Sequence, residues 1–446
     1  MSLQGRKRTI PRSRAGLAAA ALGCAALAVT ACGSGSSSSA PAPTSASGSQ
    51  AAAGSGQAVT LTFWNDYNTT DAEASTMANV VIPQFEKENP GVKVVSVQYP
   101  YADLLQKFLA AAAAGDPPNV LRSDIIWVPQ LASQGALLPV GSLPGYSSLA
   151  ADALPGPLAT TKWNGQAYAL PLDTNTQALF WNKADFKAAG ISGPPATLSE
   201  LYADAAKLTV PSKQQYGLGV DGTDIWNVAP YIWSAGGALT NDSYTAATGA
   251  MNGGGTQTAV SSLAKALQSG NIGSDFRGGS GAVSGETGFP KGQYAMYLDG
   301  PWAVPTYSQL KPPPDYGIAP VPAGTGGSVS TVGGEDIVIP QNAANQADTV
   351  KFAEFLDSPF AQLAMAKVGQ MSAMATDGAQ EVATTPYYSV FVQQLKTARA
   401  RPVSPGYSKL DTDFSNELEQ IIDGKVSASA GLAAAAQQSD AALGGS

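Results

Sequence analysis

The hydrophobic pattern of the chain first becomes regular at residues 59–64, where apolar and polar side chains alternate as in a half-buried strand. A helical pattern follows from about residue 71, restarts at Pro83 and ends at the Asn-Pro-Gly sequence of residues 89–91. The pattern therefore predicts a helix that is interrupted near its middle. Four apolar residues are predicted to lie on one side of it: Met77, Val80, Val81 and Phe85.

The alternation of strands and helices continues further along the chain. The pattern predicts a strand at residues 92–99, a helix at 101–114 that stops at Gly115, a strand at 120–126 and a helix that ends at Gly135. Such alternation predicts an α/β domain built on a mostly parallel sheet. Because the rest of the chain is too long for one compact unit of this kind, a second α/β domain is expected.

Polar and aromatic residues follow two of the predicted strands. Residues 64–67 come at the end of the first strand, and residues 124–127 come at the end of the third. Open α/β sheets bind ligands at the carboxyl ends of their strands. Both segments are therefore candidates for a ligand site.

The N-terminal segment has the composition of an export signal. Five basic residues lie within residues 6–14, and residues 15–28 are an apolar run too short for a permanent membrane span. The small residues before Cys32 resemble the lipobox of bacterial lipoproteins, where cleavage precedes the cysteine and a diacylglyceryl group joins its sulfur. An ordinary secreted protein cut near Ala31 is the alternative, and Cys24 is a weaker cleavage candidate.

The segment after Cys32 consists of Ser, Gly, Ala and Pro without charge or periodicity. Such a composition cannot bury enough apolar surface to fold. Residues 1–31 are therefore predicted to be a lipoprotein signal peptide, and residues 32–57 a disordered tether.

Composition excludes several kinds of chemistry. The chain has two cysteines, one in the signal and one at the lipid attachment point, so no disulfide is expected. The absence of histidine excludes His-based triads and HExxH zinc sites, and neither a metal site nor a cofactor is predicted. Five of the 25 basic residues leave with the signal, so 20 remain against 33 acidic ones. A mature charge near −13 argues against nucleic acid as a partner.

Six segments spread along the chain carry a resemblance to a known family. They are residues 84–94 (QFEKENPGVKV), 123–130 (SDIIWVPQ), 174–186 (TNTQALFWNKADF), 292–302 (GQYAMYLDGPW), 331–335 (TVGGE) and 352–362 (FAEFLDSPFAQ). In this order they resemble the extracellular solute-binding proteins of ABC importers, in the sugar-binding group that includes the maltose-binding protein. No single segment establishes the resemblance, whereas their shared order along the chain does.

The resemblance implies an α/β fold of the two-lobe, periplasmic-binding-protein-like type II, with a hinge and an interlobe cleft that closes on its ligand. Lobe 1 would comprise residues 58–173 and 334–375, and lobe 2 residues 174–333 and 376–446. It further implies that transmembrane permease subunits are partners. The protein is expected to be a monomer, anchored by lipid at Cys32 on the extracytoplasmic face of the cell membrane.

A sugar has an apolar C–H face and a rim of hydroxyl groups, so its site needs flat aromatic rings and short polar side chains. The resemblance places a stacking role at Trp302, and Trp226 lies near an aromatic contact of the second lobe. Trp64 and Trp127 are candidates because they lie at strand ends. Packing in the core is the alternative for all four.

Asp124 is the foremost polar candidate, because an acid between a buried strand and a helix can accept two hydroxyl donors; helix capping is the alternative. Glu335 follows Gly333 and Gly334, which permit close backbone approach at a hinge. Since no basic residue is predicted in the cleft, a neutral or cationic ligand is favoured over an anion. For the remaining candidates the alternative is a surface or turn role: Asn65, Asp66, Asn175 and Asp299.

These observations predict the substrate-binding subunit of an ABC importer that captures a sugar or oligosaccharide without turnover. A receptor for a polyol or a glycerophosphodiester is the alternative within the same fold, and a surface-anchored carbohydrate-active enzyme is the alternative outside it. Adjacent Glu335 and Asp336 would point to opposite faces of a strand, so they cannot flank one glycosidic bond as a catalytic pair.

Overall fold

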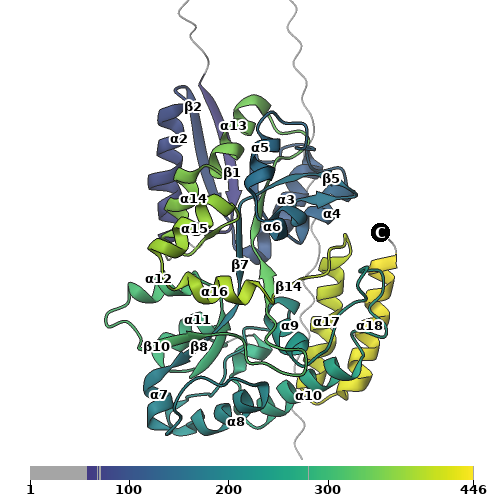
Figure 1. Cartoon of the computed structure of the whole chain (residues 1–446). Coiled ribbons are helices and arrows are strands. Elements are labelled where there is room, and N and C mark those ends of the chain that lie inside the picture. Colours follow the sequence, from purple (N-terminus) through teal and green to yellow (C-terminus); the bar gives the residue numbers. More distant parts are fainter. Residues whose placement is uncertain (1–57, 68, 70–71, 280, 445–446) are drawn as a thin grey trace, which may run out of the picture. The chain divides into compact units, whose positions relative to one another are not determined.

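The structure is a computed structural model that describes residues 58–67, 69, 72–279 and 281–444 (Figure 1). Cys32, the predicted signal peptide and the predicted tether lie outside the described residues. Within the described residues, no helix has both the length and the apolar character needed to cross a membrane.

The first sheet has five strands. Their order is β2 (Val92–Gln98), β1 (Val59–Asn65), β3 (Val120–Asp124), β12 (Glu335–Val338) and β6 (Ala169–Pro171). β1 runs parallel to β2 and β3, whereas β12 is antiparallel to β3 and β6. The predicted parallel α/β arrangement is therefore confirmed for β1–β3, and a strand from the C-terminal half of the chain completes the sheet.

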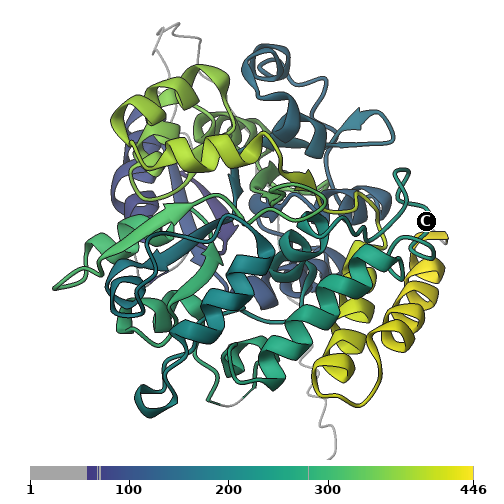
Figure 2. The same cartoon turned by 60° about the horizontal axis from the view of Figure 1, so that its bottom comes forward.

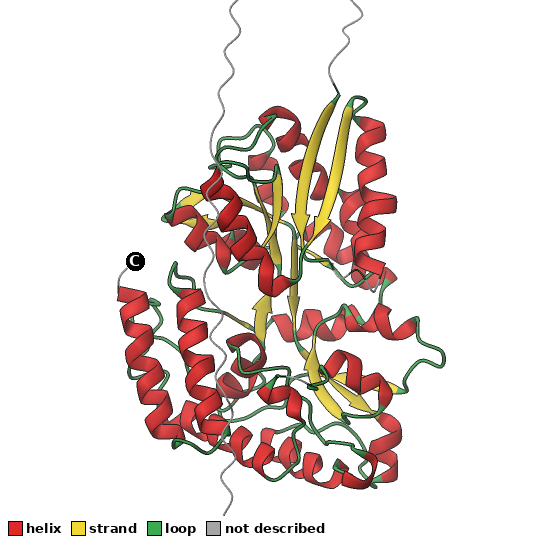
Figure 3. Cartoon of the chain, turned by 180° about the vertical axis from the view of Figure 1, so that it is seen from behind, coloured by secondary structure: helices red, strands yellow, loops and turns green. Residues whose placement is uncertain are grey.

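Helices pack around this sheet (Figures 1 and 3). The rings of Phe63, Phe85 and Phe352 form the centre of its core, with edge-to-face contacts between ring centroids 4.9 and 5.6 Å apart. The helices and the small hairpin of this region are α1 (Ala72–Thr76), the π-helix η1 (Met77–Val81), α2 (Ile82–Glu88), α3 (Tyr101–Ala114), α4 (Trp127–Ser133), α5 (Tyr146–Asp152), α6 (Pro155–Thr160), β4 (Lys162–Trp163), β5 (Gln166–Ala167), α13 (Gln346–Leu356) and α14 (Pro359–Ala366).

The predicted break in the first helix takes the form of the π-helical turn η1. Met77, Val81 and Phe85 are buried as predicted, but the prediction for Val80 was wrong, since that side chain is 43% exposed. A π-helical turn is wider than an α-helical one, so the residue at i+3 leaves the face that residues i and i+4 share. The local change of helix type therefore decides which side of the helix is buried.

The second sheet is smaller and antiparallel throughout. It consists of β10 (Tyr316–Ala319), β8 (Ala178–Asn182) and β9 (Met296–Asp299) in this order. Aromatic side chains dominate the core beside it, where Phe180 contacts Tyr297 and Tyr316. The helical elements of this region are α7 (Lys183–Ala188), α8 (Leu198–Leu208), η2 (Pro211–Lys213), α9 (Ile225–Ser234), α10 (Gly254–Gln268), η3 (Ser274–Arg277), α11 (Gly285–Gly288), η4 (Phe289–Lys291) and α12 (Ala303–Ser308).

A third sheet lies between the other two and contains the strands through which the chain crosses. Its order is β13 (Met371–Ser372), β7 (Asp173–Thr176), β11 (Thr331–Gly333) and β14 (Arg399–Ala400). Only Leu172 separates β6 from β7, and only Gly334 separates β11 from β12. The two outer sheets are therefore the centres of two lobes that these strands connect, while the lobe boundaries given above stay a prediction.

The C-terminal part of the chain is helical. α15 (Ala375–Thr384) and α16 (Tyr388–Leu395) precede β14, and α17 (Tyr407–Ile422) and α18 (Ala428–Gly444) follow it. Figure 2 shows α17 and α18 beside α10, and Asp440 of α18 accepts the backbone N–H of Ala247 at 2.6 Å. α17 and α18 therefore pack against the second lobe.

Candidate functional site

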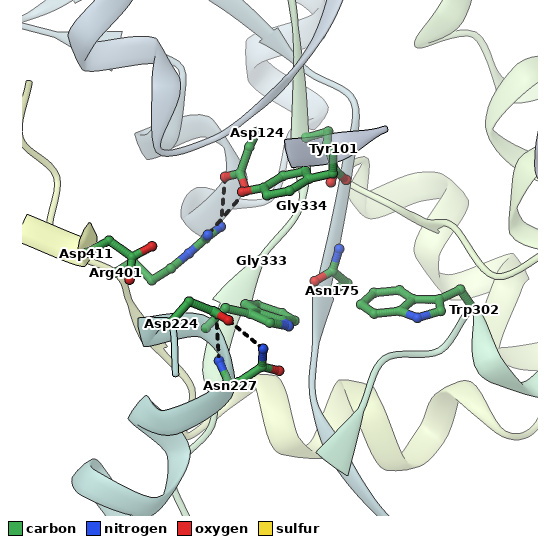
Figure 4. A pocket seen from close by; sticks show the side chains of 12 residues that line it. Tyr101, Asp124, Asn175, Asp224, Asn227, Trp302, Gly333, Gly334, Arg401 and Asp411 are labelled. Carbon is green, nitrogen blue, oxygen red and sulfur yellow. Dashed lines mark hydrogen bonds and ion pairs between the residues drawn. The ribbon is translucent and has the colours of Figure 1, made fainter. Parts of the chain in front are cut away.

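A cavity of about 360 Å³ lies where the crossing strands meet the first turns of α3 and α9 (Figure 4). This volume falls at the lower end of the range typical of small-molecule sites, roughly 300–1,000 Å³. Its lining comes from both lobes and from the strands between them. The lining residues are Tyr101, Asp124, Asn175, Asp224, Trp226, Asn227, Trp302, Gly333, Gly334, Glu335, Arg401 and Asp411.

Strand register explains why four of these residues share one wall. β12 pairs with β3 so that Glu335 lies directly opposite Asp124, and β11 pairs with β7 so that Gly333 lies opposite Asn175. Directly opposite residues of neighbouring strands point to the same face of a sheet. A shift of one residue in either pairing would turn these side chains away from the cavity.

The space around residues 333 and 334 leaves no room for a side chain, so both positions require glycine. A Cβ atom at Gly333 would lie 2.2 Å from Oδ1 of Asn175 and 2.7 Å from the ring of Trp226. Gly334 has φ of +130°, and a Cβ there would lie 2.3 Å from the carbonyl oxygen of Asp173. The absence of side chains at these two positions allows the cavity wall to form at the crossing between lobes.

Asp124 holds two other lining residues in place. Its Oδ1 accepts hydrogen bonds from Arg401 Nη2 at 2.8 Å and from the backbone N–H of Ile126 at 3.0 Å. Its Oδ2 accepts from Arg401 Nη1 at 3.2 Å and from the Tyr101 hydroxyl at 2.7 Å. Four donors occupy the two carboxylate oxygens, so Asp124 positions Arg401 and Tyr101 in this structure, and its contact with sugar hydroxyls stays a prediction.

Arg401 is a lining residue that the sequence did not indicate, and the expectation of no basic residue in the cleft was wrong. It is 4% exposed, and its guanidinium carbon lies 5.3 Å from the ring centroid of Trp226. The Nε atom is buried without a hydrogen-bond partner among the described residues. Because 277 residues separate Arg401 from Asp124, no local spacing could reveal this pair.

Two tryptophans form the aromatic part of the cavity. The ring centroids of Trp226 and Trp302 lie 6.4 Å apart with 31° between the ring planes, and both residues are half-buried. Trp226 lies in the first turn of α9, whose N-cap is Asp224, and Trp302 immediately precedes α12. The structure therefore brings together the two tryptophans predicted from the family resemblance.

Asp224 and Asp411 form an acidic part of the wall. Asp224 accepts the backbone N–H of Asn227 at 3.2 Å, as an N-cap does, and its side-chain amide at 2.7 Å. Asp411 accepts the backbone N–H of Ile225 at 2.7 Å. Burial raises the pKa of Asp224, and burial together with the charge of Asp224 raises the pKa of Asp411 to about 7. The Asp-x-x-Asn sequence before an apolar run was the available signal for Asp224.

Glu335 connects the cavity to a buried charge cluster at the crossing. Its Oε2 lies 2.6 Å from Nη2 of Arg122, which also pairs with Asp173 at 3.2 Å. Nη1 of Arg122 pairs with Asp66 at 2.6 Å. Burial raises the pKa of Glu335 well above its usual value, although Arg122 opposes this shift.

Two predicted aromatic contacts do not line the cavity. The ring of Trp64 packs edge-on against Tyr99 at 4.9 Å, and Trp127 is 4% exposed with its ring stacked on Tyr101 at 5.2 Å. Trp64 belongs to β1 and Trp127 begins α4, and neither ring is among the lining residues, so a contact between these rings and a ligand stays a prediction.

Three predicted polar contacts are also bonded elsewhere. Asn65 donates to Ser96 at 2.9 Å, and Asp66 pairs with Arg122. Asp299 accepts from the Tyr297 hydroxyl at 2.6 Å and from the N–H of Gly300 at 2.8 Å. None of the three is among the lining residues, so a contact between these side chains and the ligand stays a prediction. The remaining predicted residues, Asn175 and Glu335, do line the cavity.

No catalytic couple is evident from Glu335 and its neighbour Asp336. Asp336 is fully buried and accepts from the Thr160 hydroxyl at 3.2 Å, whereas Glu335 pairs with Arg122. Within the described part of the chain, no group of three or more His, Cys, Asp or Glu residues could hold a metal ion.

Two lobes joined by crossing strands, with a lined cavity between them, define a ligand-binding protein of the periplasmic type II fold. Residues 68–363 match the family of bacterial extracellular solute-binding proteins, and the chain belongs to this family. The predicted family and the predicted two-lobe fold are both confirmed.

Individual relatives are similar over most of their length. The chain is 30% identical over 374 residues to a binding protein of Brucella abortus (strain 2308), covering 80% of this chain and 88% of the relative. It is 23% identical over 377 residues to the galactooligosaccharide-binding protein of Bacillus subtilis (strain 168), covering 82% and 86%. Among solved structures, the GacH receptor of Streptomyces glaucescens GLA.O, studied unliganded and with acarbose, is 26% identical with a TM-score of 0.79. The match covers 86% of this chain and 98% of GacH.

Proposed function

We propose that this protein is the substrate-binding subunit of an ABC importer and that it captures a sugar or oligosaccharide in the interlobe cavity. The observation that carries the proposal is the pair of half-buried rings, Trp226 and Trp302, beside hydrogen-bonding side chains in that cavity. Aromatic faces suit the C–H face of a sugar, and polar side chains suit its hydroxyl rim. The named ligands of the Bacillus and Streptomyces relatives support the same class of ligand.

In this proposal Trp226 and Trp302 stack on sugar rings, and Asn175 and Glu335 bind hydroxyl groups. Asp124 acts indirectly by orienting Arg401 and Tyr101. Closure of the lobes about the crossing strands buries the sugar, and the permease subunits receive it from the closed form. The protein captures its ligand without chemical turnover.

An anionic ligand such as a glycerophosphodiester fits this cavity less well. Arg401 is the one cationic side chain among its lining residues, and Asp124 already holds that guanidinium with two hydrogen bonds. The other charged lining residues are acids, which repel phosphate.

Isothermal titration of the purified protein with a panel of mono-, di- and trisaccharides tests this function. We expect saturable one-to-one binding of at least one sugar, together with a raised melting temperature. Absence of binding across the panel would contradict the proposal. Release of new sugar products during incubation would instead indicate an enzyme.

The lipid anchor is a separate part of the proposal. We expect Cys32 to carry the diacylglyceryl group that retains the protein at the outer face of the cell membrane. A Cys32→Ala variant should then appear in the culture medium, whereas the wild-type protein fractionates with membranes. Membrane retention of the variant would contradict lipidation at this cysteine.

A further inference from the structure

The cavity carries more acidic charge than its own lining can neutralise. Its charged residues are the acids Asp124, Asp224, Glu335 and Asp411 and the single base Arg401. Arg401 is paired with Asp124, and Glu335 is paired with Arg122 from outside the lining. In the described part of the chain, no Lys or Arg nitrogen lies within 4.0 Å of a carboxylate oxygen of Asp224 or Asp411. Asp224 and Asp411 therefore lie in the wall without an ion-pair partner, although the charge of Arg401 acts on both.

A buried acceptor in the same wall also lacks a donor. Oδ1 of Asn175 has no hydrogen-bond partner among the described residues, although the residue is only 7% exposed. In Figure 4 the side chains of Asn175 and Trp302 project into the same cavity. An unpaired buried carbonyl oxygen is unfavourable, so this atom indicates a ligand group that donates a hydrogen bond.

These groups lie close together around Trp226. Asp224 and Asp411 both bind backbone N–H groups in the first turn of α9, to which Trp226 belongs. The Asn175 side chain and the Trp226 ring both approach Gly333, as the space at that glycine shows. Two acidic acceptors and one neutral acceptor therefore lie near the same tryptophan in the cavity wall.

An ammonium group matches this environment in both charge and hydrogen bonding. It carries one positive charge and three donor hydrogens, and it has no acceptor. A neutral hydroxyl group also donates, but it leaves the charge of the carboxylates unbalanced. Hydrogen bonds between charged groups are about twice as strong as those between neutral groups.

We propose that the sugar captured by this protein is an amino sugar, whose protonated amino group is bound beside Asp224 and Asp411 with Asn175 Oδ1 as a further acceptor. This inference rests on the proposed sugar-binding function and specifies its ligand class. Burial is the main cause of the raised pKa of both aspartates, the charge of Asp224 adds to the rise at Asp411, and the charge of Arg401 opposes both shifts. A bound ammonium group would favour the charged form of both carboxyls.

The test compares matched sugars with the purified full-length chain by isothermal titration at neutral pH. Glucose-, galactose- and mannose-configured mono- and disaccharides are each used in three forms: neutral, 2-amino and N-acetylated. N-acetylation keeps the ring but removes the positive charge. We expect the best-binding series to show a dissociation constant roughly tenfold lower for its 2-amino form than for both other forms.

Equal or tighter binding of the neutral or N-acetylated form would overturn the amino-sugar proposal while leaving the sugar-binding function intact. Absence of binding by all forms would overturn both. The two failures are therefore distinguishable in one experiment.

Two variants test whether the carboxylates of Asp224 and Asp411 cause the preference for the 2-amino form. In Asp411→Asn and Asp224→Asn the side-chain oxygen can still accept the backbone N–H of Ile225 or Asn227. We expect the preference for the 2-amino form over the neutral form to fall roughly tenfold in each variant. Asp315→Asn is the matched control, since its side chain is 73% exposed and not among the lining residues, and it should keep the full preference. An unchanged preference in both cavity variants would overturn the assignment.

Discussion

At the scale of single residues, the cavity shows that partners within the protein can occupy a carboxylate at a strand end. Asp124 occupies the position expected for a sugar contact, yet Arg401 and Tyr101 use its oxygens. In the proposed function, Trp226 and Trp302 carry the contact area instead.

Replacing Trp302 with alanine should weaken sugar binding by about 1–3 kcal/mol, because a half-buried ring that stacks on the sugar is lost. Titration with the best sugar of the panel measures this change. Trp302→Phe should retain part of the affinity, since a smaller ring remains. Unchanged affinity of Trp302→Ala would remove Trp302 from the site.

Replacing Arg401 with methionine should lower the free energy of unfolding by about 3–5 kcal/mol, because the buried carboxylate of Asp124 loses its cation. Urea unfolding measures the loss. The double variant Arg401→Met with Asp124→Asn should recover part of it, since no buried charge is then left unpaired. Equal stability of the single and double variants would contradict strong coupling between these residues.

At the scale of elements, the crossing strands determine which side chains share the cavity. The register of β12 on β3 brings Glu335 opposite Asp124, and the register of β11 on β7 brings Gly333 opposite Asn175. Gly334 joins β11 to β12 with a backbone conformation that other residues rarely adopt. Position 334 therefore does not accept a residue with a side chain without strain.

Gly334→Ala should destabilise the protein by at least about 2 kcal/mol, because φ is +130° and the new Cβ would clash with the carbonyl oxygen of Asp173. Thermal and urea unfolding give the magnitude. Gly156→Ala is the matched control, since a Cβ there meets no atom within 4 Å and φ is not positive. Similar stabilities of the two variants would contradict the strained junction.

At the scale of the whole molecule, buried acids make stability depend on pH. Burial raises the pKa of Asp275 to about 8 and the pKa values of Glu381 and Asp411 to about 7. In the unfolded chain such carboxyls titrate near 4. The folded state therefore binds more protons than the unfolded state between these values, and the free energy of unfolding falls as pH rises from about 4 to 8.

We expect a higher melting temperature at pH 5 than at pH 8 for the sugar-free protein. Asp275→Asn should reduce this difference by about 1–3 kcal/mol of unfolding free energy, because the amide no longer titrates and its oxygen still accepts the N–H of Val220. A melting temperature that rises from pH 5 to pH 8 would contradict these assignments.

The two-lobe arrangement predicts a change of size on binding. Saturation with the best sugar should decrease the radius of gyration measured by small-angle X-ray scattering, because the lobes close about the crossing strands. Trp302→Ala at a sugar concentration that saturates only the wild type should show no such decrease. Identical scattering of the free and saturated protein would contradict hinge closure.

The amino-acid sequence by itself determined the α/β class, the family and the positions of most of the early strands and helices, since hydrophobic periodicity and turn residues are local signals. It indicated Trp226, Trp302, Asn175 and Glu335, which line the cavity. Only the tertiary structure decided the rest. The Asp124–Arg401 pair joins residues 277 positions apart, and the burial that raises the pKa of Asp411 to about 7 exists only after folding. Partner choice among buried polar groups depends on distances in space, which sequence spacing does not encode.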